Sequence, residues 1–319
     1  MKNIVVIGGK KGIFNVLNGL KNYPMGITAI VSSFDSGGSS GMLREKFGTL
    51  PFGDIRGALM ALTPKNGNRK LRDLFDFRFK GVLAGHSFGN LYLQILTFVL
   101  GNEIKAIKKA SKILGVQDKV LPISIDHAHL HALLLNGKII KSETNIDNPK
   151  HNGAIKIKKI FLRPKARIYK ESYEAILKAD FIILGPGDLY TSILPNILVS
   201  GFNKALAKTK AKIIYIPNLM TKWGETNDFH ASDFARVLLK YLKKDKLAHK
   251  LDWVICNSKP FKNSLIKKYK KEKAFPVIID SDKLKKYSKN IVWKDIVSQK
   301  NIIKHDAKKL AKTIFNIIK

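Results

Sequence analysis

A chain of 319 residues with a hydrophobic fraction of 45% can bury a sizeable core, as one large α/β domain or as two small ones. Its single cysteine excludes an internal disulfide and a four-cysteine zinc site. With no signal peptide and no membrane-length apolar run, we expect a cytoplasmic protein without a membrane partner. The net charge of +34 favours anionic small ligands over nucleic acid, because only eight of the 58 basic residues are arginine.

Hydrophobic patterns in the first third of the chain predict two strands and then a block of helices. Residues 4–7 read as a buried strand, followed by a glycine turn and by a helix that carries Phe14, Leu17 and Leu20. Residues 27–31 read as a second strand. Four helices are then predicted at residues 54–62, 71–79, 87–100 and 104–114. They form a helical insertion at about 54–115 between the early and the later strands.

The remainder of the chain returns to strands. Short strands are predicted at residues 120–125, 130–135, 139–142 and 157–162. An alternating series follows, with strands at 181–184, 213–216 and 253–256 and helices at 202–208, 231–242 and 305–318. Alternating strands and helices indicate a mostly parallel sheet covered on both faces, so we expect an α/β fold. Because no repeat or linker is present, residues 1–319 are predicted to form one domain.

Gly8, Gly9 and Gly12 occupy the turn between the first strand and the first helix. A glycine turn at this place aims helix N–H groups at a phosphate, as in dinucleotide-binding proteins. Asp35 lies 23 residues beyond Gly12, near the distance expected of a ribose-binding acid. Because the spacing is not that of G-x-G-x-x-G, a plain structural turn is the alternative. Lys10-Lys11 either neutralise phosphate charge or mean that the loop no longer binds.

Residues 33–41, just after the second strand, form the most informative stretch of the chain. Asp35 offers an acceptor or metal-ligand oxygen, Gly37 and Gly38 allow close backbone approach, and Ser39 offers a hydroxyl group. Loops of this composition bind phosphate and ribose more often than they merely connect elements. We therefore expect a ligand-binding loop here.

Two predicted helix starts each allow two interpretations. Asp54 either caps its helix, which stabilises it by about 1 kcal/mol, or lies beside Asp35 and holds a divalent cation or a ligand hydroxyl. Residues 85–89 have the letters of a serine-nucleophile elbow around Ser87, but the strand that an elbow requires does not precede them. A polar turn led by Asn90 that faces a ligand is favoured over a hydrolase.

Polar, glycine-bearing loops also follow two later strands. Gly185, Gly187, Tyr190 and Thr191 lie directly after the strand at 181–184. The loop after the strand at 213–216 has the same character and contributes Asn218, Thr221 and Glu225. Because ligands of open α/β sheets bind at the carboxyl ends of the strands, three such loops together predict one binding site.

His127, His129 and His131 alternate along one predicted strand face. Imidazole groups suit zinc or iron. Three ligands from a single strand rarely converge on one ion, so a half-exposed strand face is favoured over a metal site.

Taken together, these loops resemble the gluconeogenesis factor family, relatives of the 2-phospho-L-lactate transferases of deazaflavin coenzyme synthesis. The resemblance runs from Val5 to about Asp233 and is carried by blocks in a fixed order. The blocks are Gly8-Gly9…Gly12, Asp35…Gly37-Gly38-Ser39-Ser40-Gly41…Leu43-Arg44, Leu50-Pro51…Gly53-Asp54-Ile55-Arg56, Gly85-His86-Ser87…Gly89-Asn90-Leu91, Leu184-Gly185-Pro186-Gly187…Leu189-Tyr190-Thr191-Ser192…Leu194-Pro195-Asn196, Asn218…Met220-Thr221…Gly224-Glu225-Thr226 and Ala231-Ser232-Asp233.

The resemblance implies a Rossmann-like three-layer α/β/α fold whose strand-end loops bind a nucleotide, as a UDP-sugar or a dinucleotide. It also implies a regulator that affects carbon partition into cell-envelope precursors and cell shape, with a regulatory protein as partner. The resemblance is also compatible with a homo-oligomer. In this function the glycines let backbone N–H groups reach phosphates, and Asp35 and Asn218 bind ribose or base. Ser39, Asn90 and Thr191 form hydrogen bonds with the ligand.

The transferase branch is the alternative: a magnesium-dependent enzyme that moves phospholactate from a nucleotide-activated donor, with Asp35 and Asp54 holding the metal. Three positions depart from the family pattern. Lys10-Lys11 replace Gly-Thr, Ser36 replaces a second acid after Asp35, and Lys222-Trp223 replace Gln-Pro. Because Ser36 removes a magnesium ligand, the regulator is favoured over the enzyme.

Overall fold

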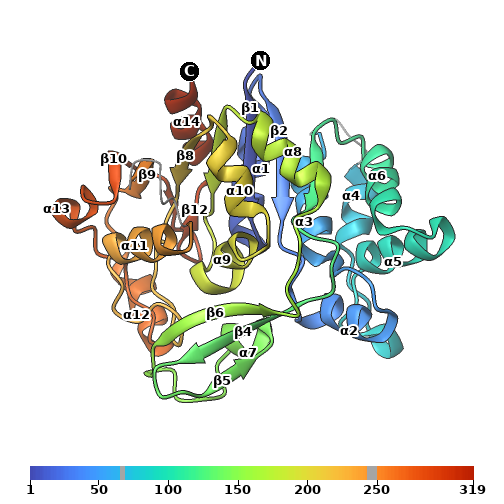
Figure 1. The fold of residues 1–319 in the computed structure, drawn as a ribbon, viewed down its shortest axis with the longest axis horizontal. Coiled ribbons are helices and arrows are strands. Elements are labelled where there is room, and N and C mark those ends of the chain that lie inside the picture. The colour runs from blue at the N-terminus through green and yellow to red at the C-terminus, as the bar shows by residue number, and fades with distance from the viewer. Residues whose placement is uncertain (65–68, 243–249) are drawn as a thin grey trace.

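Seven parallel strands form the central sheet of the structure, a computed structural model that describes residues 1–64, 69–242 and 250–319 (Figure 1). The strands are β1 (Asn3–Gly8), β2 (Gly26–Val31), β3 (Lys119–Pro122), β7 (Phe181–Leu184), β8 (Lys212–Tyr215), β9 (Leu251–Asn257) and β10 (Ser288–Lys294). Their order is β10-β9-β8-β7-β1-β2-β3. The chain therefore builds outward in opposite directions from β1 and β7, and the crevice between these two strands is the topological switch point.

Helices cover both faces of this sheet, which confirms the predicted three-layer fold. The apolar run of β1 is buried on both sides: Ile4 and Val6 join one core, and Val5 and Ile7 join the other. The first core is covered by α1 (Lys10–Leu20), α3 (Phe52–Leu62) and α14 (Ala307–Ile318). The second is covered by α8 (Lys170–Lys178), α10 (Phe202–Lys208) and α11 (Ala231–Leu242).

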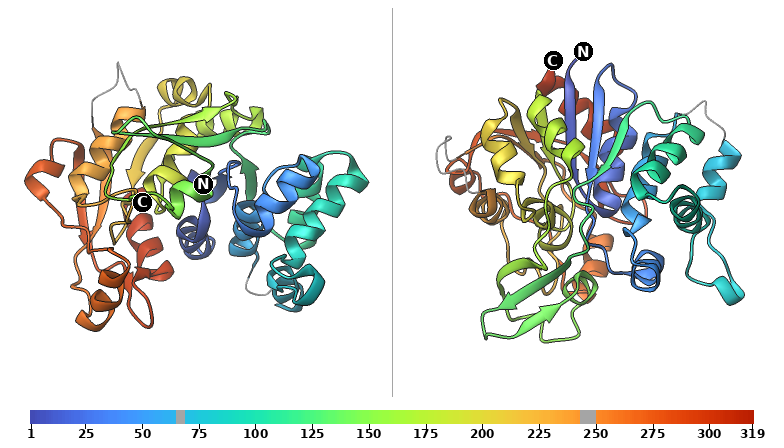
Figure 2. Two further views of the ribbon diagram at one scale, coloured as in Figure 1. Left: turned by 90° about the horizontal axis from the view of Figure 1, so that it is seen from below. Right: turned by 45° about the vertical axis from the view of Figure 1, so that its right-hand side comes forward.

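Five α-helices of the described residues lie between β2 and β3, on one side of the sheet (Figure 2). They are α2 (Gly38–Phe47), α3, α4 (Arg69–Asp76), α5 (Phe88–Leu100) and α6 (Glu103–Ile113). Helix α2 was not expected, because residues 33–41 show the composition of a loop and no apolar period; it begins inside that stretch. Helix α4 ends at Asp76 rather than at residue 79, because Arg78 pairs with Ser87 as a β-bridge.

A small antiparallel sheet lies beyond the carboxyl ends of the main strands (Figures 1 and 2). It consists of β4 (His129–Leu134), β5 (Ile139–Lys141) and β6 (Ile157–Arg163), in the order β5-β4-β6. The short helix α7 (Glu143–Asp147) follows β5. The predicted strands at 120–125, 130–135, 139–142 and 157–162 are thus present, but only the first belongs to the main sheet.

The last part of the chain contributes elements to both faces of the sheet. They are α12 (Asn263–Lys271), α13 (Ser281–Leu284), β11 (Val297–Ser298), β12 (Lys304–His305) and α14. Helix α13 packs with α11 on one face, whereas α14 packs with α1 on the other. The closing helix begins at Ala307 rather than at His305, because Asp306 caps it by accepting hydrogen bonds from two backbone N–H groups. Within residues 1–64, 69–242 and 250–319, every helix is too short or too polar to serve as a membrane span.

Candidate functional site

The glycine turns after β1 and β7 touch each other at the switch point. A Cβ atom at Gly12 would lie 2.1 Å from the carbonyl oxygen of Pro186, so only glycine allows this contact. A Cβ atom at Gly8 would lie 4.0 Å from the Cα atom of Gly185. Helix α1 begins here, and Gly9 at its N-cap offers no side chain to cap it. The two turns therefore place a helix N-terminus at the ligand position of an open α/β sheet.

Asp54 accepts a hydrogen bond from the turn after β1 and does not cap its own helix. Because α3 begins at Phe52, Asp54 lies inside the first helical turn, and its Oδ1 atom accepts a hydrogen bond of 2.8 Å from the backbone N–H of Lys10. Burial, and then the charge of Asp35, raise the pKa of Asp54 to about 7. The capping interpretation is thus wrong, and Asp54 joins α3 to the start of α1.

Asp35 lies close to Asp54, as the second interpretation of that residue requires. Its Oδ1 atom accepts a hydrogen bond of 2.9 Å from the N–H of Gly37, and its Oδ2 atom would lie 3.3 Å from a Cβ atom at Gly53. Burial raises the pKa of Asp35. Gly38 has a φ of 49°, a left-handed conformation that glycine adopts without strain.

The stretch 33–41 also contacts the turn before α5. The Oγ atom of Ser39 lies 3.0 Å from Nδ1 of His86 and accepts a hydrogen bond of 3.1 Å from the Asn90 amide. Ser87 caps α5 by accepting a hydrogen bond from the Asn90 N–H. A short 3-10 helix (Gly81–Leu83) precedes it instead of a strand, so the geometry of a serine-nucleophile elbow is absent.

The loops after β7 and β8 meet through polar side chains. The Oγ1 atom of Thr191 donates to Oε1 of Glu225 at 3.2 Å, and the side-chain amide of Asn218 donates to Oδ1 of Asp188 at 3.2 Å. Tyr190 is buried, and burial raises the pKa of its hydroxyl group. These two strand-end loops therefore form one polar surface.

Two lysines and four carboxylates form the charged centre of the site, here called the lysine–carboxylate cluster. The Nζ atom of Lys10 lies 2.6 Å from Oε1 of Glu143 and donates to Asp147. The Nζ atom of Lys222 also donates to Asp147. It lies 2.8 Å from Oδ2 of Asp188 and 3.1 Å from Oε1 of Glu225. The cluster joins the turn after β1, helix α7 and the loops after β7 and β8.

The acids of the cluster differ in how they titrate. Burial opposes ionisation of Asp147, but the charges of Lys222 and Lys10 outweigh it and lower its pKa to about 2. Burial raises the pKa of Glu143 to about 7 and that of Glu225 to about 8. Burial also works against the charge of each lysine, yet the surrounding carboxylates keep both pKa values above the ordinary value for lysine.

A cleft of about 610 Å³, here called the switch-point cleft, opens beside the cluster. Its near wall is the start of α1 and the loops after β7 and β8; its far wall comes from α12 and β12. His305 in the far wall is 7% exposed, burial lowers its pKa to about 4, and its Nε2 atom has no hydrogen-bond partner among the described residues. The cleft thus combines two ammonium groups, a helix N-terminus and a neutral imidazole.

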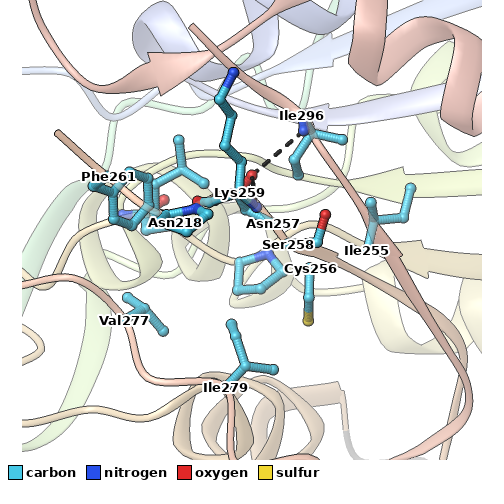
Figure 3. A pocket seen from close by; sticks show the side chains of 13 residues that line it. Asn218, Ile255, Cys256, Asn257, Ser258, Lys259, Phe261, Val277, Ile279 and Ile296 are labelled. Carbon is cyan, nitrogen blue, oxygen red and sulfur yellow. Dashed lines mark hydrogen bonds between the residues drawn. The ribbon is translucent and has the colours of Figure 1, made fainter. Parts of the chain in front are cut away.

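A smaller cavity of about 190 Å³ lies at the carboxyl ends of β8 and β9 (Figure 3). Asn218, Asn257, Ser258 and Lys259 supply its polar wall, while Phe261 and isoleucine and valine side chains supply the apolar one. Asn218 lines both this cavity and the switch-point cleft. The two spaces are therefore neighbours.

The structure divides the sequence-predicted residues into four groups. Those that line the switch-point cleft are Gly12, Gly187, Asn218 and Thr221. Those that shape the turns behind it are Gly8, Gly9 and Gly185. Those around α2, α3 and α5 are Asp35, Gly37, Gly38, Ser39, Asp54 and Asn90. Tyr190 and Glu225 line a third cavity of about 240 Å³, and Thr191 belongs with them because it donates a hydrogen bond to Glu225.

Sequence reasoning missed the partners of the two lysines and the far wall of the cleft. Glu143 and Asp147 lie four residues apart on α7, so they share one helix face. This spacing is the one feature of the sequence that could have indicated a pair of acids acting together. Asp188 lies in the predicted binding loop after the strand at 181–184, but the pattern there points to Gly187 and Tyr190 rather than to Asp188. Nothing in the local sequence marks His305.

The described residues contain one group of three carboxylates that could hold a metal ion, Asp147, Asp188 and Glu225. Asp35 and Asp54 belong to no such group of three, and their pairing around a metal stays a prediction. His129 and His131 alternate with buried residues along β4, as expected for a half-exposed face. They are absent from any metal-capable group within the described part of the chain.

Comparisons with known proteins agree over nearly the whole chain. A family model described as 2-phospho-L-lactate transferase CofD matches residues 4–297. A gluconeogenesis factor of Halalkalibacterium halodurans is 40% identical over 317 residues, which cover 98% of this chain and 95% of that protein. The gluconeogenesis factor of Bacillus subtilis is 38% identical, with 99% and 98% covered. A crystal structure of a Bacillus halodurans protein matches with a TM-score of 0.91 at 39% identity, covering 98% of this chain and 99% of that one.

Proposed function

The chain belongs to the CofD family, which includes the gluconeogenesis factors, and we propose that it is a cytoplasmic UDP-sugar-binding regulator of that type. In this role it affects carbon partition into cell-envelope precursors and cell shape, acting through a protein partner. The observation that carries the proposal is the switch-point cleft, where loops from three neighbouring strands, two lysines and the start of α1 meet.

The chemistry of the two neighbouring cavities matches the parts of a nucleotide-sugar. Backbone N–H groups at the start of α1 and the ammonium groups of Lys10 and Lys222 favour a diphosphate in the switch-point cleft. The smaller cavity presents amide groups next to an aromatic ring, a combination suited to a nucleobase. Asn218 stands between them and would contact the ribose.

Calorimetry with UDP-N-acetylglucosamine, GDP and NAD, each with and without magnesium, tests this function. We expect the UDP-sugar to bind with a dissociation constant of about 1–100 μM and GDP and NAD to bind at least about tenfold more weakly. Equal affinity for all three compounds, or no binding of the UDP-sugar, would contradict the proposal.

The transferase is the second candidate, favoured by the carboxylates of Asp147, Asp188 and Glu225, whose ligand atoms all lie within 4.8 Å of one another. In that function a divalent metal would neutralise the charge of a nucleotide-activated donor. Binding of GDP that requires magnesium, with no binding of the UDP-sugar, would favour the enzyme over the regulator.

Replacing Asp35 with asparagine tests whether the loop after β2, which lies with α2 and α3 and does not line the switch-point cleft, takes part in binding. We expect UDP-sugar affinity to fall by about tenfold with little change in the melting temperature, because the amide keeps an oxygen for the Gly37 N–H but loses the charge. Asp118→Asn is the matched control. Asp118 also accepts a hydrogen bond from a backbone N–H, that of Ile27, but at the opposite end of β2, so its change should leave binding unaltered. Equal affinities of the two variants would remove Asp35 from the site.

A further inference from the structure

The ammonium group of Lys222 lies among the three carboxylates that could hold a metal ion. Asp147 accepts a hydrogen bond from its Nζ atom, which lies 2.8 Å from Asp188 and 3.1 Å from Glu225. Among the described residues these acids form the one group of three or more side chains that could hold a metal ion. Every acid of that group is therefore already paired with a single cation that belongs to the chain.

A second ammonium group adds to this pairing. Lys10 shares Oδ1 of Asp147 with Lys222 and pairs with Glu143 on the other side. The two lysines together bring the same charge as one divalent ion. They approach the cluster from different elements, because Lys10 begins α1 and Lys222 lies in the loop after β8.

The backbone around each lysine is fixed by hydrogen bonds. The Lys222 N–H donates to Thr226 at 2.9 Å, and the preceding Thr221 pairs with Phe275 through two hydrogen bonds. The Lys10 N–H donates to Asp54, and Lys10 has a φ of 55°, a left-handed conformation that costs a residue other than glycine about 1 kcal/mol. The Lys222 side chain is 27% exposed. Both ammonium groups are thus held at the cluster.

A divalent ion does not fit this arrangement. Magnesium and calcium require oxygen ligands at about 2.0–2.6 Å. An ion bonded to Asp147, Asp188 and Glu225 at that distance would lie within contact of the Lys222 nitrogen, which already contacts the same three acids. The two positive charges would repel each other at so short a separation.

We propose that Lys10 and Lys222 take the place of a divalent cation in this chain, so that the cluster binds no metal and an anionic ligand is held without one. Both lysines also line the switch-point cleft, as does the start of α1. The first statement, that the cluster binds no metal, is the metal half of the inference and does not depend on the proposed function. The second, that an anionic ligand is held without a metal, is the ligand half and rests on the proposed function.

Manganese binding tests the metal half without any nucleotide. Titration of Mn²⁺ into the unaltered protein, followed by the electron paramagnetic resonance signal of the free ion, is expected to show no binding below about 1 mM. In the variant Lys10→Gln/Lys222→Gln the freed carboxylates should bind Mn²⁺ at least about tenfold more tightly. Adding Asp147→Asn to that variant should abolish the gain.

Lys11→Gln is the matched control, because Lys11 neighbours Lys10 but belongs to none of the ion pairs of the cluster. Its Mn²⁺ affinity should equal that of the unaltered protein. Tight Mn²⁺ binding by the unaltered protein overturns the proposal whether or not the variants fold. A double variant that retains its circular dichroism spectrum yet gains no affinity overturns it too.

The ligand half is tested by UDP-sugar calorimetry with EDTA and with excess magnesium. Equal affinities support it, and an affinity that requires magnesium contradicts it. If no UDP-sugar binds at all, the proposed function fails while the manganese experiment still decides the metal half.

Discussion

Replacing Gly12 with alanine is expected to lower the free energy of unfolding by more than about 3 kcal/mol and to abolish ligand binding. The new Cβ atom would lie 2.1 Å from the carbonyl oxygen of Pro186 and 3.1 Å from the Cα atom of Gly187. Both neighbours are backbone, so relief requires the turns after β1 and β7 to separate. Urea denaturation and UDP-sugar calorimetry measure the two effects.

Gly19→Ala provides the control for a clash that is equally severe but lies elsewhere. Gly19 belongs to the same helix, and its added Cβ atom would lie 2.2 Å from the carbonyl oxygen of Ala307 at the start of α14. We expect a comparable loss of stability, with binding retained at temperatures where the variant is folded. A Gly12→Ala protein that binds as well as Gly19→Ala would show that the contact between the two turns does not shape the cleft.

The main sheet could be predicted because its strands are buried on both faces. Such strands appear as unbroken apolar runs such as residues 4–7, and each run ends in a glycine or polar turn that marks the strand end. Helix α2 could not be predicted in the same way. Its sequence, GSSGMLREKF, carries few apolar residues, and its contacts with α3 and α5 rather than its own pattern hold it in place.

The glycine turns of the site could be predicted from the sequence because each follows its strand directly. The lysine–carboxylate cluster could not be predicted, because its members come from distant parts of the chain. Lys10 and Asp147 are 137 residues apart, and Lys222 and Asp147 are 75 apart. Each lysine was noticed as a departure from the family pattern, but a sequence does not show that two departures share one partner.

The pKa values of the buried acids predict that the ligand-free protein is most stable at mildly acidic pH. Glu225 ionises near pH 4.5 in the unfolded chain but has a pKa of about 8 in the folded protein. The folded state therefore holds a proton that the unfolded chain releases, and stability falls as the pH rises from about 4.5 to 8. Glu143 and Asp54, both with a pKa of about 7, act in the same direction. Asp147 acts oppositely, because its pKa is lowered to about 2, so its contribution is present above pH 3.8 and is lost on acidification.

Two isosteric variants separate the opposite pH dependences that Glu225 and Asp147 give to the stability of the protein. Glu225→Gln should change stability by less than about 1 kcal/mol near pH 5, where Glu225 is neutral in the folded protein, and raise it by up to about 5 kcal/mol near pH 9, where the buried charge is removed. Asp147→Asn should instead lower stability by about 2 kcal/mol at both pH values, because two half-buried ammonium groups lose their shared partner. Urea denaturation at the two pH values measures both. An effect of Glu225→Gln that is the same at pH 5 and pH 9 would mean that this acid does not titrate between them, because the Lys222 ammonium group keeps it ionised at both.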